Sequence, residues 1–314
     1  MFILRATGYI LLLLITILCG ITLTVMMNWS PAAGVFICSC LLLIWLGSLN
    51  KKTDWLYHLL IFDLAIAAFF FLLTPETQFK DVQWEKSCAV IPQTETANDG
   101  KITIMGIRNF KYRTENDFDI NYKNETFDPD KAESLDFAIS HWDGIDNIAH
   151  TMLCFNFSDG KSVVLSVEMR CPEGTSRDYY TTLFKQHELI YIWASPEDIL
   201  DLRSTYRSEA LYIYRTTATP AEVKKLFTIL TERTGNLYRK PEFYRTVSGN
   251  CTTELLPYLR HMRPSLSWDF RALLNGTIDR MFYEQDFLMY KPGESFEFLK
   301  ARSLIYPKKK KNQL

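Results

Sequence analysis

Apolar residues are distributed very unevenly along the chain. Three apolar runs, 8–27, 32–47 and 55–73, fill the first quarter, and only short polar breaks separate them. The first and third runs are long enough to cross a bilayer as helices, and the middle run is close to the lower limit. A cleavable signal peptide is the alternative for the first run, but no Ala-x-Ala site follows it and two more apolar runs do. The pattern predicts a membrane anchor of three transmembrane helices over residues 1–75.

Basic residues beside the apolar runs predict the orientation of this anchor. Arg5 precedes the first run and Lys51 and Lys52 lie between the second and third, whereas the loop after the first run carries no charge. Because basic loops stay in the cytoplasm, three spans deliver residues 76–314 to the opposite side. We therefore expect a multi-pass protein of the bacterial inner membrane whose C-terminal domain lies in the periplasm. Asp63, inside the third run, is costly in lipid, and we expect it to face the helix bundle as a packing contact or a functional group.

The remainder of the chain has the pattern of an α+β domain with an antiparallel sheet. Residues 148–157 and 162–170 alternate between apolar and polar positions around Asp159-Gly160, which predicts a β-hairpin. With pairing centred near Asp159, His150 falls opposite Glu168. One predicted face is apolar and belongs to the core: Leu153, Phe155, Phe157, Val163, Leu165, Val167 and Met169. The other face is mixed and could carry a site: His150, Met152, Cys154, Asn156, Ser162, Ser166 and Glu168.

Shorter patterns predict the other elements of the domain. Strands are expected at 101–113 and 210–214, a polar loop at 116–130, helices at 196–207 and 220–234, and a core strand or helix at 281–290. The helix at 220–234 has Thr219 as its expected N-cap and Gly235 as its stop. A further helix is expected to begin at Cys251, short or kinked at Pro257.

Charge and motif content exclude several classes of function. Lysine plus arginine number 35 and aspartate plus glutamate 36, and the domain interior has no basic cluster, so no nucleic-acid partner is expected. The lysine run 308–311 is either a solvated tail or a contact with anionic inner-membrane lipids. No Cys-x-x-Cys or His-x-x-x-His spacing and no phosphate-binding glycine loop occur, so neither a metal nor a cofactor is expected. In an oxidising compartment Cys88 and Cys171 could form a disulfide, although their spacing alone does not show it.

The segment Asn250-Cys251-Thr252-Thr253 carries the strongest chemical signal. An Asn N-cap followed by a thiol at a helix start lowers the thiol pKa and supplies N–H groups to an oxyanion. With His150 as the base and Glu168 as the group that orients it, Cys251 completes a Cys-His-acid set. The alternatives are a structural His150, a Glu168 that pairs with Arg170 at the surface, and a Cys251 that is a small buried apolar residue.

Several stretches resemble the Lnb N-terminal periplasmic domain family, and more distantly the circularly permuted papain-like thiol hydrolases, which are the NlpC-type and lecithin:retinol acyltransferase-like enzymes. These stretches are 107–110, 149–151, 166–170, 188–191, 198–203 and 250–252, so they include Arg170, Asn250 and Thr252 as further site candidates. The resemblance implies a permuted papain-like domain with a nucleophile helix. It also implies a hydrolase or acyltransferase that acts on an amide or acyl bond in peptidoglycan, a lipid or a lipoprotein. A non-enzymatic binding or assembly module on the same fold stays open.

Overall fold

The computed structural model describes residues 82–142, 147–175, 187–245 and 249–305, and the predicted membrane anchor lies outside these ranges. All of the described residues except His187 belong to one structural unit, Val82–Thr175 with Glu188–Leu314. None of the helices in the described ranges is long and apolar enough to span a membrane.

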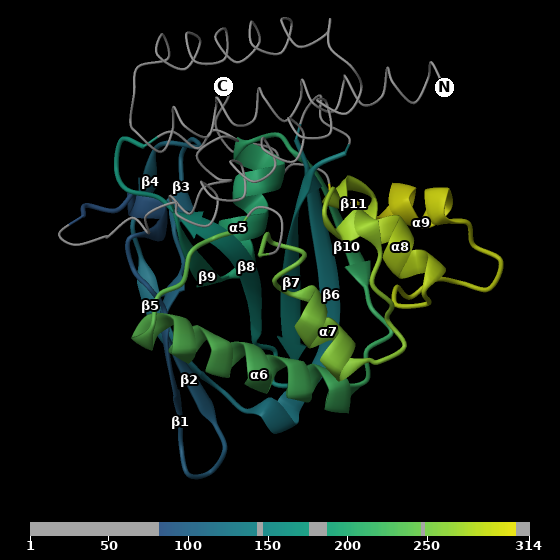
Figure 1. Cartoon of the computed structure of the whole chain (residues 1–314), viewed down its shortest axis with the longest axis horizontal. Coiled ribbons are helices and arrows are strands. Elements are labelled where there is room, and N and C mark those ends of the chain that lie inside the picture. Colours follow the sequence, from purple (N-terminus) through teal and green to yellow (C-terminus); the bar gives the residue numbers. More distant parts are fainter. Residues whose placement is uncertain (1–81, 143–146, 176–186, 246–248, 306–314) are drawn as a thin grey trace, which may run out of the picture. The chain divides into compact units, whose positions relative to one another are not determined.

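A nine-stranded sheet forms the centre of this unit (Figure 1). The strand order is β1-β2-β9-β8-β7-β6-β10-β11, and β5 pairs with β2. Neighbours are antiparallel except for β2 and β9, which meet in parallel at Arg108 and Ala194. The strands are β1 Gln93–Thr96, β2 Ile102–Arg108, β5 Tyr122–Phe127, β6 Ala132–His141, β7 Ala149–Phe157, β8 Ser162–Arg170, β9 Glu188–Ala194, β10 Ala210–Arg215 and β11 Leu304–Ile305. A separate two-stranded sheet joins β3 Lys111–Tyr112 to β4 Phe118–Asp119.

Five α-helices accompany the sheet in the described ranges, which makes the domain mixed α+β as predicted. They are α5 Pro196–Asp201, α6 Pro220–Arg239, α7 Leu256–Met262, α8 Ile278–Glu284 and α9 Phe296–Ser303. Shorter helical turns are η1 Lys86–Cys88, η2 Pro129–Lys131, the π-helical η3 Leu202–Tyr206, η4 Phe270–Ala272 and η5 Asn275–Thr277.

The predicted hairpin of β7 and β8 is confirmed in bounds and register. Cys154 pairs with Val164 and Met152 with Ser166, so the pairing is centred on Asp159. Gly160 adopts φ +82° in the turn, a left-handed conformation that glycine reaches at little cost. The predicted division of the two faces therefore holds, and it decides which side chains meet at the site.

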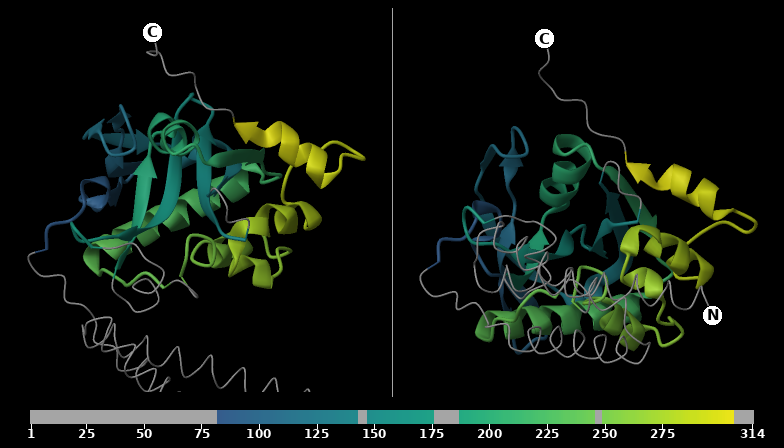
Figure 2. Two further views of the ribbon diagram at one scale, coloured as in Figure 1. Left: turned by 90° about the horizontal axis from the view of Figure 1, so that it is seen from above. Right: turned by 45° about the horizontal axis from the view of Figure 1, so that its top comes forward.

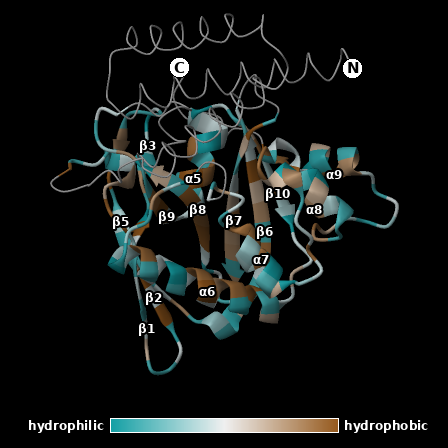
Figure 3. Ribbon diagram, viewed as in Figure 1, coloured by the Kyte–Doolittle hydropathy of each residue, from teal (hydrophilic) through white to brown (hydrophobic). Residues whose placement is uncertain are grey.

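The sheet has an apolar core on each face, whereas the sequence predicted only one. On one face α6 packs over β7, β8 and β9, and the Phe227 ring lies 5.1 Å from Phe157 and 5.6 Å from Trp193 between centroids. On the other face Ile199 of α5 packs with Cys154 and Ile192. Figure 2 shows α5 and α6 on opposite sides of the strands, and in Figure 3 the central strands are largely brown, whereas α6 carries both teal and brown residues.

Two local predictions are wrong, and each has a physical cause. The stretch 116–130 is not a loop, because it contains β4, β5 and η2. β5 is polar because it lies outside the main path of the sheet, pairs only with β2, and exposes residues such as Asn124. Gly235 does not end α6, which continues to Arg239. A Cβ at Gly235 would lie 2.8 Å from Thr94 Oγ1, so the glycine allows α6 to approach β1 closely.

Candidate active site

The hairpin brings His150 and Glu168 together on its mixed face. His150 Nε2 lies 3.2 Å from Glu168 Oε1. Ser166 fills the space beside them, with its Oγ 2.6 Å from His150 Nε2 and donating to Glu168 Oε1 at 2.8 Å. His150 is 6% exposed, so the imidazole is held in a buried, hydrogen-bonded position. Glu168 and Ser166 thus fix the ring through one of its nitrogens, as an orienting group must.

Arg203 completes the polar surroundings of Glu168, and sequence reasoning did not single it out. Its guanidinium donates to Glu168 Oε1 at 3.1 Å and to Glu209 Oε2 at 3.0 Å. Arg203 is 4% exposed and belongs to η3, where the helix of α5 changes to π-helical hydrogen bonding. The helical periodicity expected for 196–207 does not account for this change, although π-helical turns are frequent at functional sites.

Cys251 approaches His150 from the opposite face of the sheet. Its side chain belongs to the core under α6 and is 5% exposed. Cys251 Sγ lies 3.9 Å from the carbonyl oxygen of Ala149, the residue before His150, and the thiol shares a hydrogen bond with the imidazole. The structure therefore brings all three residues of the predicted set, Cys251, His150 and Glu168, together at the start of β7.

The charges in this cluster favour an ionised thiol. Burial alone would raise the pKa of Cys251, but the charge of His150 and its hydrogen bond outweigh burial and lower that pKa to about 7. Burial and the charge of Arg203 oppose protonation of His150, yet Glu168 and Cys251 raise its pKa to about 9. Burial likewise opposes ionisation of Glu168, but His150 and Arg203 hold its pKa well below the usual range. Between about pH 7 and 9 the cluster holds a thiolate beside an imidazolium, the nucleophilic form of such a pair.

Asn250 shapes the turn that carries the thiol. Its Oδ1 accepts hydrogen bonds from the N–H groups of Thr252 at 2.9 Å and Thr253 at 2.8 Å. The prediction of Asn250 as the N-cap of a helix that begins at Cys251 is wrong, since α7 begins at Leu256 and its N-cap is Leu255. Asn250 instead accepts these two hydrogen bonds within a turn. Pro257 explains the difference, because it has no N–H to donate to Thr253 and so interrupts the helical hydrogen bonds at that point.

Asn275 connects the thiol turn to β7, and nothing in the local sequence distinguished it. Its Nδ2 donates to Cys251 Sγ at 3.2 Å and to Thr252 Oγ1 at 2.9 Å, and its Oδ1 accepts from the Ala149 N–H at 2.9 Å. Thr252 Oγ1 also lies 3.0 Å from Thr151 Oγ1. Thr252 therefore contacts the framework of the thiol turn, and Asn275 supplies a buried amide donor beside the sulfur.

Arg170, the remaining candidate, lies in a different cluster. It pairs with Glu188 at 2.8 Å, its guanidinium carbon lies 3.9 Å from the centre of the Trp84 ring, and it donates to the carbonyl oxygen of Cys88 at 3.1 Å. Glu168 is bonded to His150, Ser166 and Arg203, so the alternative of a Glu168–Arg170 pair is wrong. Cys88 Sγ lies 3.9 Å from the carbonyl oxygen of Cys171, and their disulfide stays a prediction.

No group of three or more His, Cys, Asp or Glu side chains in the described part of the chain is arranged to hold a metal ion.

Comparison with known protein families gives a match. Neither a curated protein nor a solved structure matches the chain, and its relation to papain-like enzymes stays a prediction. The family model of the Lnb N-terminal periplasmic domain matches residues 118–278, just over half of the chain. The matched region contains His150, Glu168, Arg203, Cys251 and Asn275, and the family description places this region in the periplasm. The chain belongs to the Lnb N-terminal periplasmic domain family.

Proposed function

We propose that the chain is a membrane-anchored periplasmic cysteine hydrolase or acyltransferase that acts on an amide or acyl bond of a cell-envelope substrate. One observation carries this proposal: the thiol of Cys251, whose pKa is lowered to about 7, is coupled to an imidazole that lies 3.2 Å from a partly buried carboxylate. A structural cysteine in an apolar core has its pKa raised, as that of Cys154 is by burial. Cys251 is equally buried but shifts in the opposite direction.

In the proposed reaction Cys251 is the nucleophile and His150 transfers the protons. The Cys251 thiolate attacks the carbonyl carbon, and the His150 imidazolium gives its proton to the leaving amine or alkoxide as the bond to it breaks. A thioester on Cys251 results. His150, now neutral, takes a proton from water or from an acceptor alcohol or amine, which attacks the thioester and releases the acyl product. The thiolate and the imidazolium are restored.

Asn275 is the proposed oxyanion donor, through the Nδ2 hydrogen that it directs at Cys251 Sγ. Sequence reasoning assigned this role to N–H groups at a helix start, but those of Thr252 and Thr253 are already bonded to Asn250. The Asn275 amide is buried and lies 3.2 Å from the sulfur, which places it near the carbon that the sulfur would attack.

The proposed substrate classes are peptidoglycan peptides, lipids and lipoproteins. The predicted membrane helices, together with contacts between the lysine run 308–311 and inner-membrane lipids, would keep the domain near such substrates. A non-enzymatic binding or assembly module is the second candidate. The low exposure of Cys251 and His150, 5% and 6%, favours that candidate, because a substrate must gain access to both.

Thiol reactivity separates the two candidates. The full chain in lipid nanodiscs is treated with iodoacetamide at pH 7, and each cysteine is followed by peptide mass spectrometry. Cys154 is a matched internal control, since it is 6% exposed but has a raised pKa. We expect Cys251 to react at least about tenfold faster than Cys154, because about half of it is thiolate at this pH. His150→Ala should remove this difference.

Acyl transfer is tested on the same sample with a p-nitrophenyl ester. We expect a burst of p-nitrophenol together with an acyl mass on the Cys251 peptide, both lost in Cys251→Ser. If Cys251 is alkylated no faster than Cys154 and carries no acyl group, the enzymatic proposal is rejected in favour of the binding module.

A further inference from the structure

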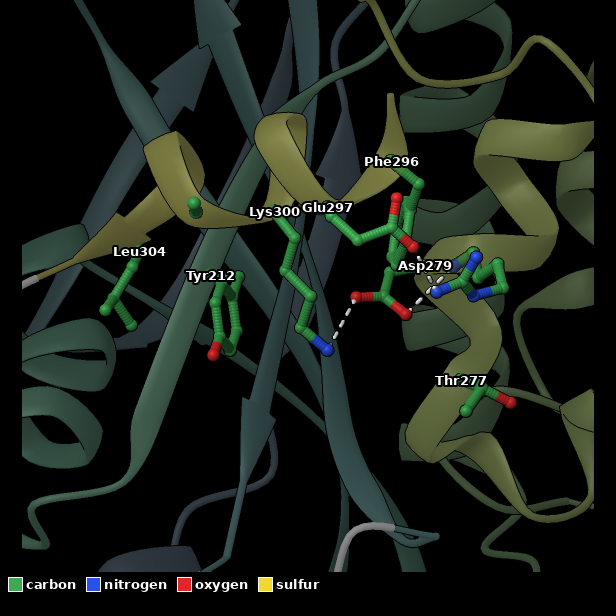
Figure 4. Close-up of a pocket in the computed structure, with 9 residues that line it drawn as sticks. Tyr212, Thr277, Asp279, Phe296, Glu297, Lys300 and Leu304 are labelled. Atoms are coloured by element: carbon green, nitrogen blue, oxygen red, sulfur yellow. Dashed lines mark hydrogen bonds and ion pairs between the residues drawn. The ribbon is translucent and has the colours of Figure 1, made fainter. Parts of the chain in front are cut away.

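A polar cavity lies among β10, α8 and α9, on the side of the sheet that α6 covers (Figure 4). Its volume is about 350 Å³, within the range of small-molecule sites. The lining residues are Tyr212, Thr277, Asp279, Arg280, Phe296, Glu297, Lys300, Ala301 and Leu304. Two cations, two carboxylates and two aromatic rings thus face a small space.

Lys300 has hydrogen-bonding capacity that the described residues do not use. Its Nζ lies 3.6 Å from Asp279 Oδ2, too far for a good hydrogen bond, and 4.9 Å from the centre of the Tyr212 ring. Figure 4 shows the ammonium pointing between these two groups. None of the described side chains or carbonyls accepts a hydrogen bond from Nζ, so its three donors are available to an occupant of the cavity.

Asp279, in contrast, is fully engaged within the protein. It is 1% exposed, and it accepts hydrogen bonds from the Tyr214 hydroxyl at 2.9 Å and from the Arg280 N–H at 2.9 Å. Its carboxylate lies beside the partly buried Lys300 ammonium, at 3.6 Å. The carboxylate therefore supports the cation and is not itself open to a ligand.

Arg280 provides a second cation at the cavity. Its Nη2 donates to Glu297 at 2.8 Å and its guanidinium carbon lies 4.5 Å from the centre of the Phe296 ring. A guanidinium has five donors, and this one uses a single side-chain partner among the described residues, with the side chain 44% exposed.

We propose that this cavity binds a small carboxylate, with the carboxylate held by Lys300 and Arg280 and the rest of the molecule packed on Tyr212, Phe296 and Leu304. An ammonium beside a guanidinium is a strong partner for a carboxylate. A single negative charge suits the site, whereas a phosphate dianion would be repelled by Asp279 and Glu297. Both a free amino acid and the carboxyl end of a peptide carry the required group.

The cavity is linked to the thiol centre by η5. This three-residue turn begins with Asn275, which bonds to Cys251, and ends with Thr277, which lines the cavity. Binding of the carboxylate uses none of the thiol chemistry, so the proposal goes beyond the proposed function and is tested separately from it.

Ligand-observed NMR on the full chain in nanodiscs tests the assignment. N-acetylalanine has the carboxylate and N-acetylalaninamide lacks it, so the first should give a saturable Kd and the second none. Lys300→Met and Arg280→Met should each raise the Kd about tenfold or more, since each removes a charge-assisted hydrogen bond. Arg302→Met is the matched control, because Arg302 is 43% exposed and pairs with Glu294 but does not line the cavity. It should leave the Kd unchanged.

Two further experiments identify the class of ligand and show whether binding is independent of the thiol cluster. Alanine compared with a peptide that ends in alanine shows which source of carboxylate is preferred. Cys251→Ser should bind N-acetylalanine as the parent does. The proposal is overturned if N-acetylalanine does not bind, if the amide binds equally well, if inorganic phosphate binds more tightly, or if neither Lys300→Met nor Arg280→Met weakens binding. Thermal unfolding identifies variants that fail to fold, and the variant that does fold decides the outcome.

Discussion

Replacing Glu168 by glutamine is the sharpest perturbation of the thiol cluster. The carboxylate lies 3.2 Å from His150 Nε2 and raises the pKa of that imidazole, whereas Arg203 acts in the opposite direction. Without the carboxylate charge, the pKa of His150 falls from about 9 and a smaller fraction of the ring is protonated at pH 7. The thiolate of Cys251 then loses the positive charge that stabilises it, so its pKa rises.

The size of the effect follows from the thiolate fraction. A thiol with a pKa of about 7 is half ionised at pH 7, but one that returns to the ordinary value of 9.0 is about 1% ionised. Alkylation of Cys251 at pH 7 should therefore slow by up to about fifty-fold in Glu168→Gln. A change of two pKa units corresponds to about 3 kcal/mol of lost interaction between His150 and Cys251.

The assay is the pH dependence of iodoacetamide labelling of Cys251 between pH 5 and 10, with tryptophan fluorescence to confirm folding. Arg203→Met should shift the Cys251 midpoint the other way, because removing this cation raises the pKa of His150 further and keeps the imidazolium that stabilises the thiolate to higher pH. Glu242→Gln is the control: Glu242 forms an ion pair with Arg233 and is 47% exposed. If Glu168→Gln and Glu242→Gln both keep the parent midpoint, the carboxylate does not tune the thiol and the argument fails.

Three further predictions concern stability and are measured by urea unfolding. Phe227→Ala should lower the free energy of unfolding by about 3–5 kcal/mol because the ring is fully buried, whereas Phe298→Ala, with 64% exposure, should change it little. Gly235→Ala should destabilise the fold despite its better helix propensity, since the new Cβ meets Thr94; a stability gain would contradict the close approach of α6 to β1. Arg263, the residue that follows α7, lowers the pKa of Glu222 to about 2 through its hydrogen bond and its charge. This interaction stabilises the fold above about pH 4.5 and is lost as the pH falls towards 2, so Glu222→Gln should remove that part of the acid dependence.

Sequence alone predicted elements whose stabilising contacts are local. The β7–β8 register follows from the alternation on both sides of Asp159-Gly160, and the start of α6 was predicted from Thr219 as N-cap. The structure adds that Thr219 forms a capping box with Glu222. β5 was missed because it reaches its partner β2 from outside the main path of the sheet and keeps polar residues, so its composition is that of a loop. The extent of α6 was missed because the reason for Gly235 lies on a distant strand.

The residues of the candidate site also divide into those that the sequence could place and those that it could not. His150 and Glu168 belong to one hairpin, so pairing geometry was sufficient to place them together. Arg203 and Asn275 come from separate helical turns, and their partners are fixed only when those turns pack against the sheet. Nothing in the sequence near residue 203 indicates a π-helical turn, and Asn275-Gly276 has the pattern of an ordinary surface turn.

The position of the thiol has a consequence for how the chain matures. Cys251 comes from the layer under α6, whereas His150, Ser166 and Glu168 face the layer of α5, and the two meet only at the first residues of β7. During synthesis the hairpin emerges about a hundred residues before the cysteine. Until both layers have closed, the sulfur keeps the weak acidity of a free side chain and reacts slowly with oxidants of the envelope. The lowered pKa of Cys251 therefore belongs to the assembled fold and is absent from the unfolded chain.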